Sequence, residues 1–318
     1  MLDGGNKGST SSPFPDPLPP APALAVGANP IAGAAFWVNP NSSAKQQADA
    51  WLATRPADAA QMEKIARNSQ AEWMDGSTSD IFTAVNNVVT GAAAVGAAPV
   101  LVAYNIPQRD CGGLSGGGST ITDYESWIAA FANGLAGRKS IVILEPDALT
   151  QMDCLSAADQ ATRISLLQYA LAVLKAQPNV AVYLDGGNSS WKSASDQAGR
   201  LTRANIAGAD GFALNVSNFQ FTSSSIAYGK AVSDLIGGKH FVIDTSRNGL
   251  GPTADNQWCN PADRALGSPS TTVTDDSRAD AYLWIKPPGE SDGSCGGAPA
   301  AGLWWADYAL GLAERSTF

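Results

Sequence analysis

The amino-acid sequence predicts an α/β fold in which a parallel sheet closes, or nearly closes, into a β/α barrel. Two observations carry this prediction. Short apolar runs rich in β-branched residues alternate with Ala-rich amphipathic stretches, which is typical of repeated βα units. Polar and acidic residues gather where these runs end, as they do at the carboxyl face of such barrels. A doubly wound open sheet is the alternative, but no glycine fingerprint of the dinucleotide-binding type follows the first run.

Eight runs are predicted as strands because each is short, apolar and bounded by residues that favour turns. The second has the weakest support. In chain order the runs are 34–40, 71–74, 99–105, 141–147, 180–187, 211–217, 240–246 and 281–287. Helices are expected between them, for example over 123–137 and 160–176.

The bulk composition limits the classes of partner. Residues 1–30 are rich in Pro, Gly and Ser, so we expect a linker there and one barrel domain over 31–318. The 20 basic and 29 acidic side chains give a net charge of -9, which lacks the basic footprint of a nucleic-acid-binding protein. Residues 1–30 lack the basic start and the apolar h-region of a signal peptide, and no run of eighteen apolar residues occurs. We expect a soluble monomer without a nucleic-acid or membrane partner.

Four cysteines stand at positions whose spacing matches no zinc motif, and His240 is the single histidine. Disulfides are therefore favoured over a metal site. Of the three possible connectivities we favour the sequential pairs Cys111–Cys154 and Cys259–Cys295, because each pair then closes one long Gly-rich excursion. Buried free thiols are the alternative. Disulfides would place the mature protein outside the cytosol, in a secreted or extracellular setting.

The stretch "VILEPDAL" illustrates the polar residues that follow the predicted strands, since a buried run ends there in two carboxylates around a proline. Asp147 alone could be a helix N-cap. That explanation does not extend to a whole ring of polar strand ends. The ring consists of Asn39, Asn105, Arg109, Asp110, Glu145, Asp147, Asp185, Asn215, Ser217, Asp244, Arg247, Lys286, Glu290 and Asp292.

Two kinds of chemistry suit this ring. Acyl transfer by a Ser-His-Asp triad is not supported, because the sequence has one histidine and no nucleophile motif. A pair of acids could hydrolyse a glycosidic bond, one of them kept protonated by its surroundings. Alternatively, the acids could hold a divalent metal while Lys286 abstracts a proton.

Aromatic residues favour the glycosidic alternative. Trp73, Tyr104, Trp191 and Trp258 lie next to the expected mouth of the barrel, where flat rings suit the apolar faces of sugars. Each of them alone would more often be a core residue. Their neighbours, however, are loop residues such as "DGGNSSW" and "DNQWCNP".

Eight blocks of sequence together carry a resemblance to a known family: "FWVNPNSSA", "VAYNIPQRDCGG", "VILEPDAL", "YLDGGNSSW", "LNVSNF", "VIDTSRNGLGP", "QWCNPADRALG" and "LWIKPPGESDGSC". In this order they resemble glycoside hydrolase family six, the inverting cellulases that cut β-1,4-glucan, over residues 34–296. The resemblance implies a distorted parallel β/α barrel, TIM-like, with about seven strands. It implies no cofactor and no metal.

The resemblance also implies roles for the acids. Asp147 of "EPD" matches the general acid, and Asp110 of "RDC" matches a second acid that raises the pKa of Asp147 and relays a proton. Asp185 matches a supporting carboxylate, and Asp292 matches the candidate base. The substrate-binding set implied by the resemblance is Tyr104, Trp73, Trp191, Trp258, Lys286, Glu290, Ser217 and Asn188.

Two departures refine the expected activity. The family's pattern has a histidine where this chain has Asn188, and the extra Trp of exo-acting members is Ala194 here. The segments between the paired cysteines look short, so we expect an open cleft and internal cutting, that is, an endo-β-1,4-glucanase. Alternatives are a cellobiohydrolase, a glucanase of another linkage specificity, a metal-dependent lyase and a non-catalytic glucan-binding protein.

Overall fold

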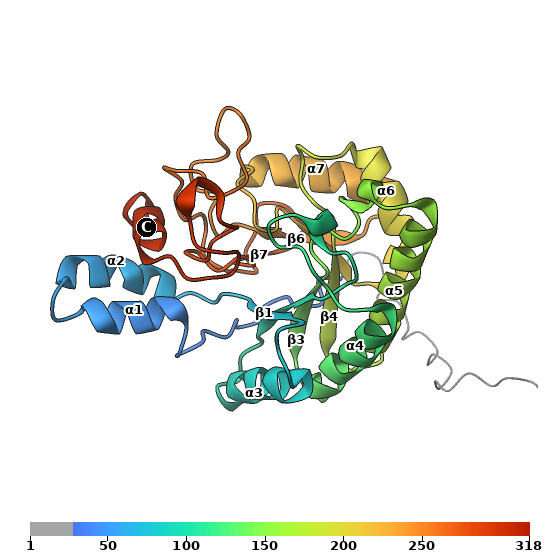
Figure 1. Ribbon diagram of the computed structural model, residues 1–318, viewed down its shortest axis with the longest axis horizontal. Coiled ribbons are helices and arrows are strands. Elements are labelled where there is room, and N and C mark those ends of the chain that lie inside the picture. The colour runs from blue at the N-terminus through green and yellow to red at the C-terminus, as the bar shows by residue number, and fades with distance from the viewer. Residues whose placement is uncertain (1–27) are drawn as a thin grey trace, which may run out of the picture.

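The computed structural model describes residues 28–318, and its centre is one curled sheet of seven parallel strands in the order β1-β2-β3-β4-β5-β6-β7 (Figure 1). The strands are β1 Glu72–Asp75, β2 Val100–Tyr104, β3 Ser140–Leu144, β4 Val180–Asp185, β5 Gly211–Leu214, β6 His240–Asp244 and β7 Ala279–Leu283. The expected fold class, a distorted TIM-like barrel of about seven parallel strands, is confirmed. The predicted linker over 1–30 lies outside the described residues except for 28–30.

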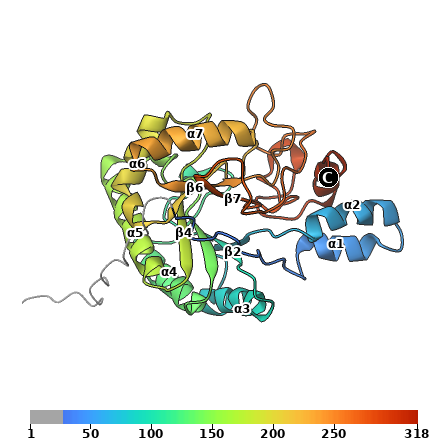
Figure 2. The same ribbon diagram turned by 180° about the vertical axis from the view of Figure 1, so that it is seen from behind.

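The α-helices are α1 Ser43–Trp51, α2 Pro56–Ala66, α3 Ile81–Ala94, α4 Ile121–Leu135, α5 Ala157–Lys175, α6 Ala194–Arg203, α7 Thr222–Leu235 and α8 Ala306–Glu314. Short 3-10 helices are η1 Asp110–Gly112, η2 Met152–Cys154, η3 Ile206–Gly208 and η4 Cys295–Gly297. Helices α3 to α7 follow one another around the outside of the sheet, whereas α1 and α2 form a separate lobe near the C-terminus (Figures 1 and 2). In the described chain, none of the helices could cross a membrane.

The structure differs from the prediction for the first two runs, because the second run is a strand of the sheet and the first is not. The weakly supported run 71–74 is β1, which pairs with β2 from Glu72 to Asp75. The run 34–40 makes only one bridge, between Phe36 and Ala98. The reason is that β1 already pairs with residues 101–104 of β2, so that the run 34–40 can reach only Ala98, just before that strand begins.

The barrel stays open at one seam. No ladder joins β7 to β1 in residues 28–318. Instead the backbone N–H of Ala71 donates to the carbonyl of Trp284 at 2.9 Å, and the indole N–H of Trp73 donates to the carbonyl of Ile285 at 2.7 Å. Two hydrogen bonds thus hold the edges near each other without a continuous sheet.

Successive side chains of a strand point to opposite faces of the sheet. The strands therefore contribute to two cores, one inside the barrel and one beneath the outer helices. In β3, Ile141 and Ile143 pack in the barrel interior, while Val142 and Leu144 pack against the outer helices. The strands β2 to β7 are buried along their whole length, which is why they read as continuous apolar runs.

The helices that follow the loops at the carboxyl ends of the strands begin at defined caps. The hydroxyls of Thr120, Ser156 and Ser193 each accept the N–H three residues later, at the starts of α4, α5 and α6. Such caps stabilise a helix by about 1 kcal/mol. They also fix where each polar loop ends.

Both sequential cysteine pairs are bonded in the structure. Cys111 is joined to Cys154 across a sequence separation of 43, and Cys259 is joined to Cys295 across 36. Each bond links two loops that leave the carboxyl ends of different strands, so that the loops which carry the strand-end acids are tied together in pairs.

Candidate active site

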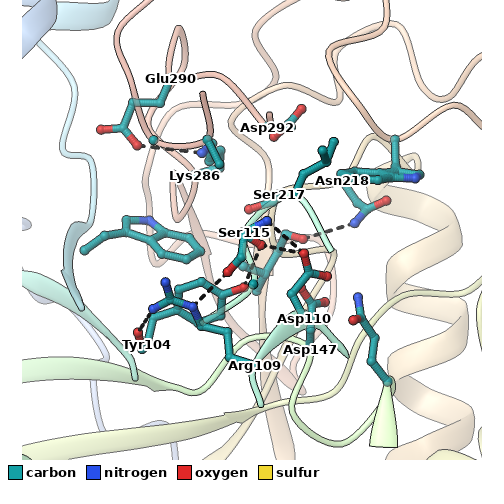
Figure 3. A pocket seen from close by; sticks show the side chains of 18 of the residues that line it. Tyr104, Arg109, Asp110, Ser115, Asp147, Ser217, Asn218, Lys286, Glu290 and Asp292 are labelled. Atoms are coloured by element: carbon teal, nitrogen blue, oxygen red, sulfur yellow. Dashed lines mark hydrogen bonds and ion pairs between the residues drawn. The ribbon is translucent and has the colours of Figure 1, made fainter. Parts of the chain in front are cut away.

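A cavity of about 900 Å³ lies at the carboxyl ends of the strands (Figure 3). Its wall includes ten of the residues that the sequence marked as a site: Trp73, Tyr104, Asp110, Asp147, Trp191, Ser217, Trp258, Lys286, Glu290 and Asp292. Loops from strands far apart in the sequence therefore converge on one space. Asp185 and Asn188 are buried and do not line this cavity.

Asp147 is delivered into the cavity by a tight turn after β3. The backbone of Glu145 and of Asp147 is left-handed, with φ of 49° and 69°, and Pro146 lies between them. Such conformations are costly for residues other than glycine and cluster at functional sites. The backbone N–H of Asp147 donates to Asp185 Oδ2 at 3.0 Å, which holds the turn against the end of β4.

The two carboxyls differ in what their surroundings favour. Burial raises the pKa of Asp185 to about 7, and the N–H groups of Asp147 and Gly187, which donate to Asp185 at 3.0 and 3.1 Å, act in the opposite direction. Burial, then the charge of Asp185, then that of Asp110, raise the pKa of Asp147 well above its usual range. Asp147 is consequently the carboxyl that keeps its proton. Asp185 contributes more to this shift than Asp110, for which the sequence predicted the effect.

Asp110 lies in η1 at φ 53° and belongs to a hydrogen-bonded group of its own. Its Oδ2 accepts from the Ser115 backbone N–H at 2.9 Å and from the Ser115 hydroxyl at 3.0 Å (Figure 3). The Ser115 hydroxyl is also 3.0 Å from the Tyr104 hydroxyl. Arg109 donates to the Ser115 carbonyl and stacks 4.4 Å above the Tyr104 ring. Sequence reasoning missed Ser115, which carried no signal beyond its place in a Gly-rich loop.

Asp292 stands on the opposite wall in a bidentate ion pair with Arg247. Arg247 is fully buried, and its Nη1 and Nη2 each lie 2.9 Å from one oxygen of Asp292. The backbone N–H of Asn260 donates to Asp292 Oδ2 at 3.0 Å. The carboxylate is thus held rigidly, with Oδ1 bearing the fewer hydrogen bonds.

Asp244 organises a further part of the wall although it does not line the cavity. Its side chain is buried at the end of β6, and its Oδ2 accepts the backbone N–H groups of Ser217 and Lys286, both at 3.0 Å. Sequence reasoning counted Asp244 among the strand-end acids and gave it no role. Its role is to orient two neighbouring polar residues.

One end of the cavity combines charge with aromatic surface. Lys286 Nζ lies 3.7 Å from Glu290 and 5.6 Å from the centre of the Trp73 ring. Trp73 meets Tyr104 edge to face with ring centroids 5.2 Å apart. Burial raises the pKa of Glu290, which the Lys286 cation partly offsets.

Asn188 instead shapes the loop on the other side. Its Oδ1 accepts from the backbone N–H of Ser190 at 2.9 Å and from the Ser190 hydroxyl at 2.7 Å, so its side chain closes a turn and does not reach the cavity wall. The next residues, Trp191 and Lys192, do line the cavity. Lys192 is held by Asp153 at 2.6 Å.

The two walls are in contact where Gly293 meets Leu114. Gly293, which follows Asp292, lies against the Leu114 side chain of the Asp110 loop, and a β-carbon on Gly293 would come within 2.6 Å of Leu114 Cβ. Both loops carry a disulfide, at Cys111 and at Cys295. The contact therefore joins two stapled loops at the rim of the cavity.

This arrangement is that of a glycoside hydrolase. It has a carboxyl whose pKa is raised by burial and by neighbouring acids, and rings that can cover the faces of sugars. In the described part of the chain, no three His, Cys, Asp or Glu side chains are grouped as metal ligands.

Comparisons with known proteins give the family. Residues 31–316 match the model of the glycosyl hydrolases family 6, and the chain belongs to this family. Endoglucanase A of Cellulomonas fimi is 46% identical over 285 residues, which are 88% of this chain and 61% of that protein. This chain thus spans about three fifths of that relative's length. Endoglucanase 1 of Streptomyces halstedii is 42% identical over 272 residues, or 82% of each protein.

A solved structure agrees with the fold and the family. The endoglucanase Cel6 of Mycobacterium tuberculosis superposes with a TM-score of 0.86 at 46% identity, over 91% of this chain and 99% of that one. That protein was solved in complex with methyl-cellobiosyl-4-deoxy-4-thio-β-D-cellobioside.

Proposed function

We propose that this protein is an inverting endo-β-1,4-glucanase that hydrolyses internal bonds of cellulose or of soluble β-1,4-glucans. The observation that carries the proposal is the Asp147 carboxyl, which lines a cavity with aromatic walls beside Asp185 and whose pKa is raised well above its usual range. The names of the bacterial relatives and the thio-oligosaccharide bound by the Mycobacterium tuberculosis enzyme support the same substrate class.

In this proposal Asp147 protonates the glycosidic oxygen as the bond breaks. General acid catalysis needs a group that is still protonated near the working pH, and burial together with Asp185 supplies that condition. Asp110 would relay the proton, and its hydrogen bond to the Ser115 hydroxyl, which in turn contacts the Tyr104 hydroxyl, supports this role. Asp185 acts from behind as the supporting carboxylate.

Asp292 remains the candidate base, which would remove a proton from the attacking water. Its position across the cavity from the Asp147 loop suits attack on the opposite face of the sugar, as inversion requires. Ser217 would lie near that water. Trp73 and Trp258 would stack sugars on the glycone side, where Lys286 and Glu290 would bind sugar hydroxyls. Tyr104 would lie beneath the distorted sugar, and Trp191 would lie across the cleavage point.

Internal cutting is proposed over exo attack on two grounds. The bacterial relatives at 42 to 46% identity are named endoglucanases, whereas a relative named a probable exoglucanase, from Podospora anserina, is 29% identical. The position of the extra exo-type Trp is Ala194, the first residue of α6. We further propose that the protein is secreted and monomeric, in keeping with its two disulfides.

Proton NMR of the purified protein acting on cellohexaose, with EDTA present, tests this function. The α-anomer should appear first, before mutarotation, because a single displacement inverts the anomeric carbon. An initial β-anomer would mean retention and would refute the mechanism. Absence of any product would refute the assigned substrate, and activity lost only with EDTA would favour the metal-dependent lyase.

A further inference from the structure

Two loops carry Asp110 and Asp147, and their backbone is unusually strained. Thirteen residues other than glycine have positive φ in the described chain, and five of them lie in these two loops: Gln108 (56°), Asp110 (53°), Cys111 (50°), Glu145 (49°) and Asp147 (69°). Left-handed residues of this kind persist only where the surroundings over-determine them. Both loops therefore need contacts with the surrounding structure that hold this backbone conformation.

Arg163 of helix α5 reaches both loops from behind. Its side chain is buried, and its Nη2 donates to the carbonyls of Pro107 and Gln108 at 2.9 and 2.8 Å. Its Nη1 donates to the carbonyl of Ala148 at 3.2 Å. One guanidinium thus binds the backbone two residues before Asp110 and one residue after Asp147.

Glu145 makes the complementary link with its carboxylate. Both of its oxygens lie 3.0 Å from the backbone N of Asn105, and Oε2 also accepts from Ile106 at 3.1 Å. Glu145 belongs to the Asp147 turn, whereas Asn105 and Ile106 begin the Asp110 loop. Burial raises the pKa of Glu145 to about 7, and the backbone N–H donors act in the opposite direction.

Neither residue is explained by a simple ion pair. Within the described residues, Arg163 and Glu145 form no salt bridge with each other or with other side chains. A buried charge is costly unless hydrogen bonds satisfy it. Here the hydrogen-bond partners of both side chains are backbone atoms of the two acid-bearing loops, and Arg163 Nε is left without a partner among the described residues.

We propose that Arg163 and Glu145 are positioning residues which set the distance and orientation between Asp110 and Asp147. The inference rests on the proposed function for its kinetic consequences. Arg163 donates hydrogen bonds to backbone carbonyls of these loops, and Glu145 accepts hydrogen bonds from backbone N–H groups of the same pair of loops. Together they restrain the loops in two directions. The Cys111–Cys154 bond limits how far the loops can part, and the buried pair determines where they settle within that limit.

The test uses Arg163→Met and Arg163→Lys in the disulfide-bonded protein, with Arg138→Met as the matched control. Arg138 also donates to a backbone carbonyl, that of Asn86, but it precedes β3 at the opposite end of the barrel from the cavity. We expect Arg163→Met to lower kcat on cellohexaose on the order of 10²-fold with KM nearly unchanged, since a displacement of about 1 Å has that effect. Arg163→Lys should restore part of the loss, and Arg138→Met should resemble the wild type.

The pH profile separates positioning from a direct effect of charge. Wider separation of Asp110 from Asp147 weakens the repulsion that raises the pKa of Asp147, so the basic limb of kcat should move to lower pH in Arg163→Met. The acidic groups that act on Asp147 are Asp185 and Asp110. Loss of a nearby cation alone would move the limb to higher pH instead. A shift to higher pH, or an unchanged profile with unchanged kcat, would overturn the proposal.

A readout without substrate keeps the inference distinct from the proposed function. Hydrogen exchange of backbone amides over 105–112 and 147–154 should become faster in Arg163→Met and in Glu145→Gln, while α8 stays protected. The titratable or charged side chains that act on Glu145 are those of Tyr124, Arg109 and Arg163. If Arg163→Met does not fold, Arg163→Lys and Glu145→Gln decide. Unchanged exchange would refute the positioning role, whereas inactivity of the wild type would refute the function alone.

Discussion

Asp185 holds the backbone N–H of Asp147 at 3.0 Å while its charge raises the pKa of the Asp147 side chain. One carboxylate thereby performs two tasks, since it fixes the turn that presents Asp147 and keeps the Asp147 carboxyl protonated. Removing the charge of Asp185 should therefore have an effect that differs from removing Asp147.

Asp185→Asn tests the second task. An asparagine oxygen can still accept the two backbone N–H groups, but the negative charge is lost, so Asp147 should release its proton at lower pH. In the proposed mechanism the protonated form of Asp147 is the acid, so the basic limb of the kcat profile should move down by about one unit. The profile is measured on cellohexaose from pH 4 to 9. A limb that moves upward would show that Asp185 does not control the proton of Asp147.

Asp147→Ala tests the acid itself. Loss of general acid catalysis should lower kcat on cello-oligosaccharides by about 10²- to 10⁴-fold. Aryl cellobiosides with good leaving groups need little protonation, so their hydrolysis should be largely spared. Equal losses on both classes of substrate would reject the role.

Asp292→Ala tests the candidate base, with Asp292→Asn as the variant that keeps the shape of the site. We expect turnover to fall by at least about 10²-fold and sodium azide to restore it, with an α-glycosyl azide as the product. Asp292 neutralises the buried Arg247, so the alanine variant should also unfold more easily. Thermal unfolding distinguishes the two effects. Nearly normal turnover in a folded Asp292→Asn protein would remove this residue from the mechanism.

The Cys111–Cys154 bond should stabilise the folded protein. It closes a sequence separation of 43, for which loop entropy gives about 4 kcal/mol. Replacing both cysteines by serine should lower the free energy of urea unfolding by roughly this amount. In the native protein, which keeps all four cysteines, a thiol titration should find no free thiol. Four reactive thiols would contradict the pairing.

The sequence was sufficient for the fold class because β2 to β7 are short, fully buried apolar runs, and such runs need little tertiary information to be recognised. The strand β1 was harder. Its residues are only partly buried, and its assignment depends on how the run 34–40 and β1 compete for the edge of β2. That competition is a tertiary effect and leaves no local pattern.

The site was predictable where its residues follow strand ends, as Asp147, Asp110 and Asp292 do. Residues that act through the backbone were not. Asp244 was marked as a strand-end acid but its orienting role was not, and Ser115 was missed altogether. Arg163 lies within a helix, where its sequence context resembles that of any exposed arginine. The left-handed backbone at Glu145 and Asp147 likewise becomes visible only in three dimensions.

The contact between Leu114 and Gly293 bears on how far apart the acids of the two walls lie. Gly293 has no side chain, so the loop that carries Asp292 can lie against the loop that carries Asp110. A larger residue at this position would displace one of the two loops, and with it the acid that the loop carries. The spacing of the acids across the groove through which the glucan would pass therefore depends on one glycine.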